Sequence, residues 1–189
     1  MSAYRMPENV PQPDTGVSAD VTLPGLRGLR DLADLRPTIV KDSREQTPLI
    51  FTRLASVTGT LYAGDYSVRG LEASFAVERK SIDDLAGCCM GANRDRFERE
   101  LLRLRGYRFR RLLVIGSRDD IAAGRYHSKI APKAVLATLG AFEARYLPVV
   151  FAATPQEAAA LIEKWVWYFA REVVENANDL LRGSKEMAR

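Results

Sequence analysis

The chain has 189 residues, of which 47% are hydrophobic and 28% are charged, which is enough to bury the core of one domain. The net charge is only +4, but 22 of its 28 basic residues are arginine, which suits bidentate contacts to phosphate or carboxylate groups. A single histidine, His127, and two adjacent cysteines, Cys88 and Cys89, exclude two-histidine zinc sites and disulfide frameworks. No apolar run is long enough to span a bilayer and no signal peptide is recognisable, so we expect a cytoplasmic protein.

Residues 1–36 are predicted to be a leader separate from the folded domain. Residues 6–16 contain three prolines and little apolar surface, which favours disorder or an extended docking arm. Further along the leader, leucines recur every third position, a spacing that permits a short docking helix: Leu23, Leu26, Leu29, Leu32 and Leu35.

The first half of the domain reads as strands. The β-branched run at 38–40 predicts a buried strand, and 62–68 and 74–77 predict two more, joined at Arg69-Gly70 as an antiparallel hairpin. Ser81 is expected to cap a short helix over 82–85, and Asn93 to cap the next helix.

Strands then alternate with helices. The patterns predict a strand at 111–115, a helix at 132–145, a strand at 148–151 and a last helix from Pro155 to about Leu181. This alternation predicts a parallel half of the sheet, so we expect a mixed α/β fold with an antiparallel hairpin and helices on both faces. The domain is expected over 37–182, followed by a short tail at 183–189.

Acidic residues gather at the predicted strand ends. Asp42 and Glu45 follow the first strand, Asp65 enters the second, and Glu78 ends the third, where the hairpin brings it near Asp65. Neighbouring carboxylates repel one another unless a cation joins them, and oxygen ligands favour Mg²⁺ or Mn²⁺ over zinc. Lys80 shares a strand face with Glu78, where it can orient a water, help to deprotonate it, or neutralise a phosphoryl group. The cluster therefore indicates phosphodiester hydrolysis.

Three ordered blocks carry a family resemblance: Asp-x-Arg-Glu at 42–45, Gly-Asp-Tyr at 64–66 and Glu-Arg-Lys-x-x-x-Asp at 78–84. Together they resemble the nuclease domain of the XPF-type (ERCC4 domain) structure-specific endonucleases. These enzymes have the restriction-endonuclease-like fold of the PD-(D/E)xK superfamily. The resemblance extends less sharply through 93–115, where the family also has an arginine-bearing helix followed by an apolar strand.

The resemblance implies roles for the matching residues. It implies Asp65 and Glu78 as ligands of Mg²⁺, with Asp42 as a further ligand that binds directly or through a water, and with Mn²⁺ able to substitute. It also implies Lys80 as the catalytic lysine. Glu45 matches a further catalytic position in the outer part of the site.

Two other matching residues have alternative roles. Arg79 either holds a phosphate or pairs with a carboxylate. Asp84 either caps the following helix or supports the site from behind by orienting Arg79 or Lys80.

An arginine ridge follows the motif. Residues 94–111 hold eight arginines against three acidic residues. The ridge is interpreted as a surface that tracks the DNA backbone, the alternative being a solvated helix face with intrahelical ion pairs. The candidate DNA-binding residues are Arg94, Arg96, Arg99, Arg103 and Arg105.

The last predicted helix is apolar on two sides, which fits either a deeply buried helix or one that also forms a homodimer. Many relatives that cut branched DNA append a helix-hairpin-helix domain, which is not expected after this helix. A nuclease domain that stands alone favours a prokaryotic or phage source.

The sequence thus predicts a divalent-metal-dependent DNA endonuclease that acts on branched or structured DNA in repair, recombination or replication. One alternative is a non-catalytic DNA-binding or scaffolding module that keeps the nuclease fold. Another is an exonuclease or a resolvase within the wider PD-(D/E)xK superfamily.

Overall fold

The structure is a computed structural model that describes residues 36–187. Its centre is a six-stranded sheet in the order β2-β1-β3-β4-β5-β6. The strands are β1 (Ile39–Asp42), β2 (Ser56–Gly59), β3 (Tyr66–Val68), β4 (Phe75–Ser81), β5 (Phe109–Ile115) and β6 (Val149–Ala152).

The sheet is mixed. β3 runs antiparallel to both β1 and β4, whereas β4, β5 and β6 run parallel to one another. Along the β4–β5 pair, Phe75 lies opposite Phe109 and Ser81 lies opposite Ile115. The parallel strands therefore end together at one edge, and the segments that follow them meet there.

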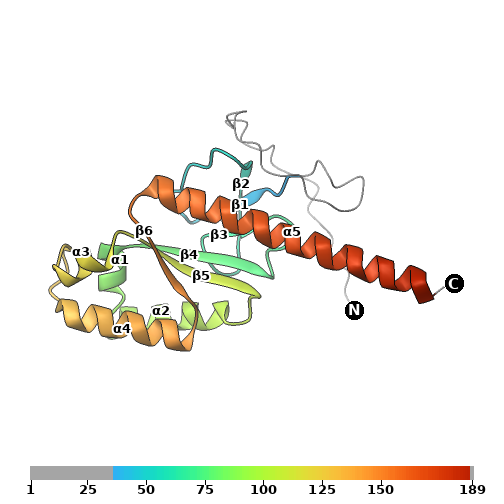
Figure 1. Cartoon of the computed structure of the whole chain (residues 1–189). Helices are drawn as coiled ribbons and strands as arrows, with labels where there is room; N and C mark the ends of the chain where they lie inside the picture. Colours follow the sequence, from blue (N-terminus) through green and yellow to red (C-terminus); the bar gives the residue numbers. More distant parts are fainter. Residues whose placement is uncertain (1–35, 188–189) are drawn as a thin grey trace.

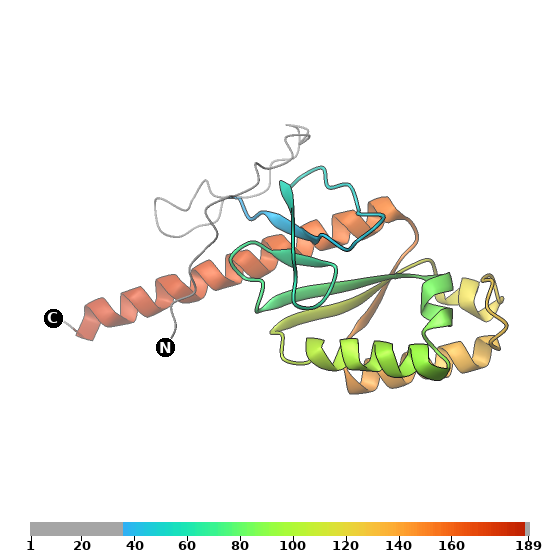
Figure 2. The same ribbon diagram turned by 180° about the vertical axis from the view of Figure 1, so that it is seen from behind.

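Helices cover both faces of the sheet (Figure 1). They are α1 (Ile82–Gly87), α2 (Gly91–Leu104), α3 (Arg118–Ala122), α4 (Pro132–Arg145) and α5 (Pro155–Met187). The view from behind shows α5 alone on one face and α2 and α4 on the other (Figure 2). None of these helices is both long and apolar enough to cross a membrane.

Side-chain alternation along the strands builds one core on each face. Val77 of β4 and Leu113 of β5 pack in the core under α5, while Ala76 and Leu112 pack in the core formed with α1, α2 and α4. Because side chains two apart on a strand share a face, Glu78 and Lys80 lie on the α2 side with Ala76.

The predicted mixed sheet with helices on both faces is confirmed, but two elements were missed. β2 has only four residues, Ser-Val-Thr-Gly, and gains its strand structure by pairing in parallel with β1 at the sheet edge. α3 has five residues and depends on a capping box between Ser117 and Asp120, which leaves no apolar periodicity to read.

Several element ends also differ from the prediction. β3 begins only at Tyr66, although a strand was expected from 62, because residues 62–65 form bends instead; β4 continues to Ser81 past the expected end at 77, and β5 begins at Phe109 before the expected start at 111. Asn93 does not cap α2, because the helix begins at Gly91, with Met90 at its N-cap position and no side-chain cap. α5 continues to Met187, through most of the expected tail at 183–189. The predicted leader lies outside the described residues, except for Arg36, which is exposed and belongs to no element.

Candidate active site

The acidic residues of the motif come from three adjacent strands. Asp42 ends β1, Asp65 directly precedes β3, and Glu78 lies in the second half of β4. Backbone hydrogen bonds tie these positions together: the Asp42 N–H donates to the Asp65 carbonyl, and the Asp65 N–H donates to the Val77 carbonyl, both at 2.8 Å.

The glycine of the Gly-Asp pair allows this approach. Gly64 has a φ of +80°, and a Cβ added there would lie 3.1 Å from the carbonyl oxygen of Val77. A larger residue would meet both the strained backbone conformation and the neighbouring strand. Gly64 therefore lets Asp65 reach β4 beside Glu78.

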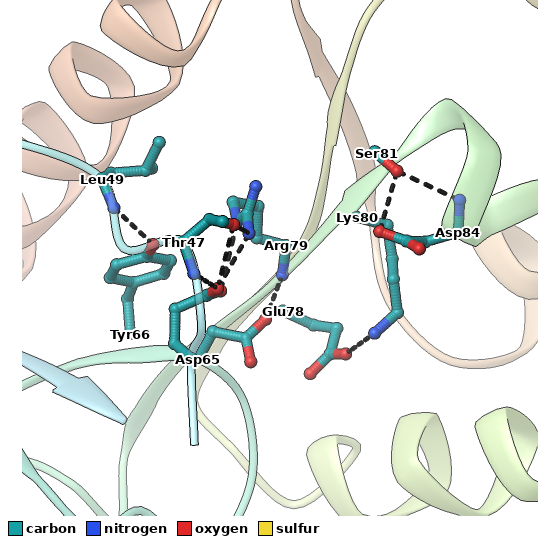
Figure 3. Close-up of polar contacts among 10 residues, drawn as sticks. Thr47, Leu49, Asp65, Tyr66, Glu78, Arg79, Lys80, Ser81 and Asp84 are labelled. Carbon is teal, nitrogen blue, oxygen red and sulfur yellow. Dashed lines mark hydrogen bonds and ion pairs between the residues drawn. The ribbon is translucent and has the colours of Figure 1, made fainter. Parts of the chain in front are cut away.

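The carboxylates of Asp65, which is half-buried, and Glu78, which is buried, form a close pair (Figure 3). Burial, followed by the negative charge of Glu78, raises the pKa of Asp65 to about 7. Burial also raises the pKa of Glu78, although Lys80 acts in the opposite direction. The site thus holds more negative charge than its own cations neutralise, which fits a bound positive ion.

Lys80 lies against this pair. Its Nζ donates a 2.7 Å hydrogen bond to Oε1 of Glu78 and lies 5.0 Å from the centroid of the Phe97 ring on α2. Burial alone would lower the pKa of Lys80, but the charge and hydrogen bond of Glu78 raise it. Lys80 is therefore a protonated donor in this state, which fits orienting a water or neutralising charge better than accepting a proton.

Asp42 is directed toward Arg44, a residue that the sequence analysis did not assign to the site. The Asp42 carboxylate accepts hydrogen bonds from the backbone N–H, Nε and Nη2 of Arg44 and from the Leu61 amide. Burial would raise the pKa of Asp42, but these hydrogen bonds lower it. Besides Asp42, the charges of Asp65 and Glu78 raise the pKa of Arg44, so its guanidinium lies within electrostatic reach of all three carboxylates.

The structure thus brings two of the three predicted metal ligands together. Across residues 36–187, no group of three or more acidic, histidine or cysteine side chains is arranged to hold a metal ion. The role of Asp42 as a ligand stays a prediction, because in this structure Arg44 binds its carboxylate.

Arg79 pairs with Glu45, one of the two alternatives for this arginine. Its guanidinium donates to both carboxylate oxygens of Glu45, at 3.2 and 2.9 Å, and to Oγ1 of Thr47 at 2.8 Å. Its backbone N–H donates to Oδ2 of Asp65 at 2.7 Å. Arg79 therefore links the segment after β1 to one of the paired carboxylates.

Asp84 caps α1. Its backbone N–H donates to Oγ of Ser81, and its carboxylate accepts from the same hydroxyl at 2.8 Å (Figure 3). No hydrogen bond or ion pair joins Asp84 to Arg79 or Lys80 in the described contacts, so the capping role is the one that the structure contains.

A comparison with protein families matches residues 41–164 to the ERCC4 domain, a span that includes every residue of this site. The chain belongs to the ERCC4 domain family. A search of curated proteins finds no match.

Solved structures support the same fold. XPF from Aeropyrum pernix is 22% identical with a TM-score of 0.55, and the match covers 71% of this chain and 61% of that chain. XPF from Aeropyrum pernix in complex with DNA is 21% identical with a TM-score of 0.55, covering 72% and 66%. This ERCC4 domain therefore has the XPF nuclease fold and spans about two thirds of those chains.

The arginine ridge of the ERCC4 domain divides into two groups. Arg94 pairs with Glu98 at 2.8 Å, and Arg96 lies 3.8 Å from Glu100, as expected for intrahelical pairs on a solvated face. The other three candidate DNA-binding arginines of the ridge are exposed and form no ion pair with any described residue: Arg99, Arg103 and Arg105. These three retain the charge that a phosphate-binding surface needs.

Proposed function

We propose that this ERCC4 domain is a divalent-metal-dependent endodeoxyribonuclease. The observation that carries the proposal is the close pair of Asp65 and the buried Glu78, with the Nζ of Lys80 hydrogen-bonded to Glu78. Carboxylates whose pKa values are raised beside a specific charged partner cluster at functional sites. Membership of the ERCC4 domain family supports the same activity.

The donor set fits Mg²⁺, with Mn²⁺ as a substitute. Carboxylate oxygens are hard ligands, and Mg²⁺ is commonly held by one or two carboxylates with waters and substrate phosphates completing the shell. Asp65 and Glu78 would hold the ion, and Asp42 would add a further oxygen once its carboxylate left Arg44. When bound, the ion would supply a Lewis acid at a phosphodiester oxygen.

Other side chains of the domain would assist the hydrolysis. Lys80 would orient the attacking water and stabilise the charge that develops on the phosphoryl group, because it is held as a cation beside Glu78. Arg44 has a largely exposed side chain and would contact a phosphate once it left Asp42 and the Leu61 carbonyl. Arg79, held by Glu45, would keep Asp65 in place through its backbone N–H.

DNA is the proposed substrate. One of the similar structures is described as XPF in complex with DNA, and Arg99, Arg103 and Arg105 offer charged contacts for a backbone. Such contacts position DNA without reading its sequence. Branched or structured DNA, met in repair, recombination or replication, is therefore the preferred substrate class to test.

A homodimer through α5 is also proposed. The first half of this helix buries Ile162, Val166 and Phe169 in the core, which accounts for one apolar side. The helix then extends past the sheet (Figure 1), and Leu180 on this second half is 72% exposed among the described residues. Light scattering at micromolar concentration tests the dimer, which a monomer mass would contradict.

The decisive experiment is a cleavage assay on labelled duplex, splayed-arm, flap and four-way-junction DNA, with Mg²⁺, Mn²⁺ or EDTA. Metal-dependent cuts that disappear in Asp65→Asn would establish the nuclease, and nicking of a closed circle would separate an endonuclease from an exonuclease. Binding without cleavage under every metal would favour a DNA-binding or scaffolding module.

A further inference from the structure

Residues 43–55, between β1 and β2, contact the candidate active site; we name them the β1–β2 loop. Near its start, Glu45 binds the guanidinium of Arg79, and in its middle the Leu49 N–H donates to the hydroxyl of Tyr66 at 2.9 Å. Tyr66 follows Asp65, and Arg79 lies between Glu78 and Lys80. The loop is therefore hydrogen-bonded to Tyr66 and Arg79, which are the residues next to Asp65 and Glu78 in the chain (Figure 3).

The far end of this loop is fixed by a carboxylate from the other end of the domain. Oε1 of Glu163, on α5, accepts hydrogen bonds from three successive backbone N–H groups: Thr52 at 2.9 Å, Arg53 at 2.6 Å and Leu54 at 3.1 Å. Glu163 is only 3% exposed. A buried carboxylate that receives three amide donors is a strong and directional anchor.

We propose that Glu163 is a positioning residue for the nuclease centre. By fixing the 52–54 end of the β1–β2 loop, it holds Glu45 against Arg79 and, through the Arg79 N–H, keeps Asp65 beside Glu78. This inference rests on the proposed nuclease function and adds a residue that lies outside all three motif blocks. It gives α5 a part in catalysis besides covering the sheet.

The loop has enough apolar contacts to stay folded without this anchor. Leu49, Phe51 and Leu54 are each less than 8% exposed and pack in the core under α5. Removing the carboxylate should therefore leave the loop in place but widen the range of backbone positions at 52–54. A misplacement of catalytic groups by a fraction of an ångström is enough to slow a reaction severalfold or more.

The test compares Glu163→Ala with Glu163→Gln, whose amide oxygen can still accept the three N–H groups. Because Glu163 also lines a cavity of about 360 Å³, the alanine variant leaves extra space, and the isosteric glutamine variant controls for it. Asp120→Ala is the matched control, since it removes the capping box of α3 without touching the β1–β2 loop.

In Glu163→Ala we expect kcat for DNA cleavage to fall about tenfold, with KM changed by less than about twofold, and Mn²⁺ affinity to fall severalfold. Glu163→Gln should recover most of both values, and Asp120→Ala should change neither. Unchanged kcat and Mn²⁺ affinity in Glu163→Ala would overturn the proposal, as would an equal loss of kcat in Asp120→Ala.

Amide hydrogen exchange by NMR tests the same link without activity or metal. We expect faster exchange in Glu163→Ala at Leu54 and also at Arg79, whose N–H donates to Asp65. Faster exchange at Leu54 alone would overturn the coupling to the site. If the wild-type protein cleaves no DNA, the proposed function fails, while the exchange at Arg79 still decides whether Glu163 positions this pair.

Discussion

Lys80 donates a 2.7 Å hydrogen bond to Glu78, two residues earlier on β4, and both side chains are at least four-fifths buried. A buried ion pair of this kind costs desolvation energy that its own attraction only partly repays. The proposed metal ion would give this ion pair a third partner, and the raised pKa values of Asp65 and Glu78 are consistent with that proposal.

The first prediction concerns Lys80→Met, which removes the ammonium group but keeps an apolar stem against Phe97. We expect cleavage to fall by about a hundredfold or more, because the charge beside the phosphoryl group is lost. DNA affinity, measured by fluorescence anisotropy, should change by less than about threefold. Lys133→Ala, at an exposed position on α4, is the control, and full cleavage by Lys80→Met would remove Lys80 from the mechanism.

The second prediction concerns pH and Asp65. Its pKa is raised from 3.8 to about 7 in the folded protein, so the native state holds this proton more tightly than the unfolded state. The free energy of unfolding of the metal-free protein should therefore fall as the pH rises from about 4 to 7. Asp65→Asn removes this cost and should raise the Tm at pH 8 by several degrees, but only slightly at pH 5.

The wild type and Asp65→Asn also test whether a divalent cation binds at this pair of carboxylates. Mn²⁺ should raise the Tm of the wild type at pH 8, where Asp65 is deprotonated, and have little effect on Asp65→Asn. Thermal melts at pH 5 and 8, with and without Mn²⁺, check both statements. A wild-type Tm that does not change when Mn²⁺ is added at pH 8 would contradict metal binding by Asp65 and Glu78.

The third prediction concerns the Glu45–Arg79 ion pair. Burial would raise the pKa of Glu45, but the hydrogen bonds from Arg79 and the Thr47 amide lower it, so the pair stabilises the fold above the unfolded pKa near 4.5. This stabilisation is lost as the pH falls through the lower, folded value. Glu45→Gln should thus reduce the free energy of unfolding by about 1–3 kcal/mol at pH 7, with a smaller difference at pH 3.

The order of the motif blocks predicted much of this site. Alternation along a strand placed Glu78 and Lys80 on one face, and the hairpin placed Asp65 beside Glu78. The partner of Asp42 was not predictable in the same way, because Arg44 lies two residues away and reaches it through a side-chain rotamer that no spacing rule encodes. Glu163 was missed because its partners are backbone amides about 110 residues earlier, which leave no sequence pattern.

Secondary structure shows the same division. Long apolar patterns, such as those of α4 and α5, were read correctly as helices, since their periodicity reflects a buried face. β2 is a strand because it pairs with β1 at the edge of the sheet, and α3 is stabilised by the capping box that Ser117 and Asp120 form. Such short elements depend on tertiary or local polar contacts, which the hydrophobic pattern does not report.

The last prediction separates the two groups of ridge arginines. Each phosphate contact releases counterions, so the slope of log affinity against log salt falls by about 0.9 for every contact that is removed. Arg99→Ala and Arg103→Ala, which lose unpaired arginines, should each weaken DNA binding severalfold and reduce this slope by nearly one. Arg96→Ala should have a smaller effect, because Glu100 already neutralises part of the charge of Arg96, although the two groups are 3.8 Å apart.

The matched control is Arg171→Ala on α5, on the other face of the sheet, where Arg171 pairs with Glu175. Equal slopes for Arg99→Ala, Arg103→Ala and Arg171→Ala would show that α2 is a solvated helix and that DNA lies elsewhere.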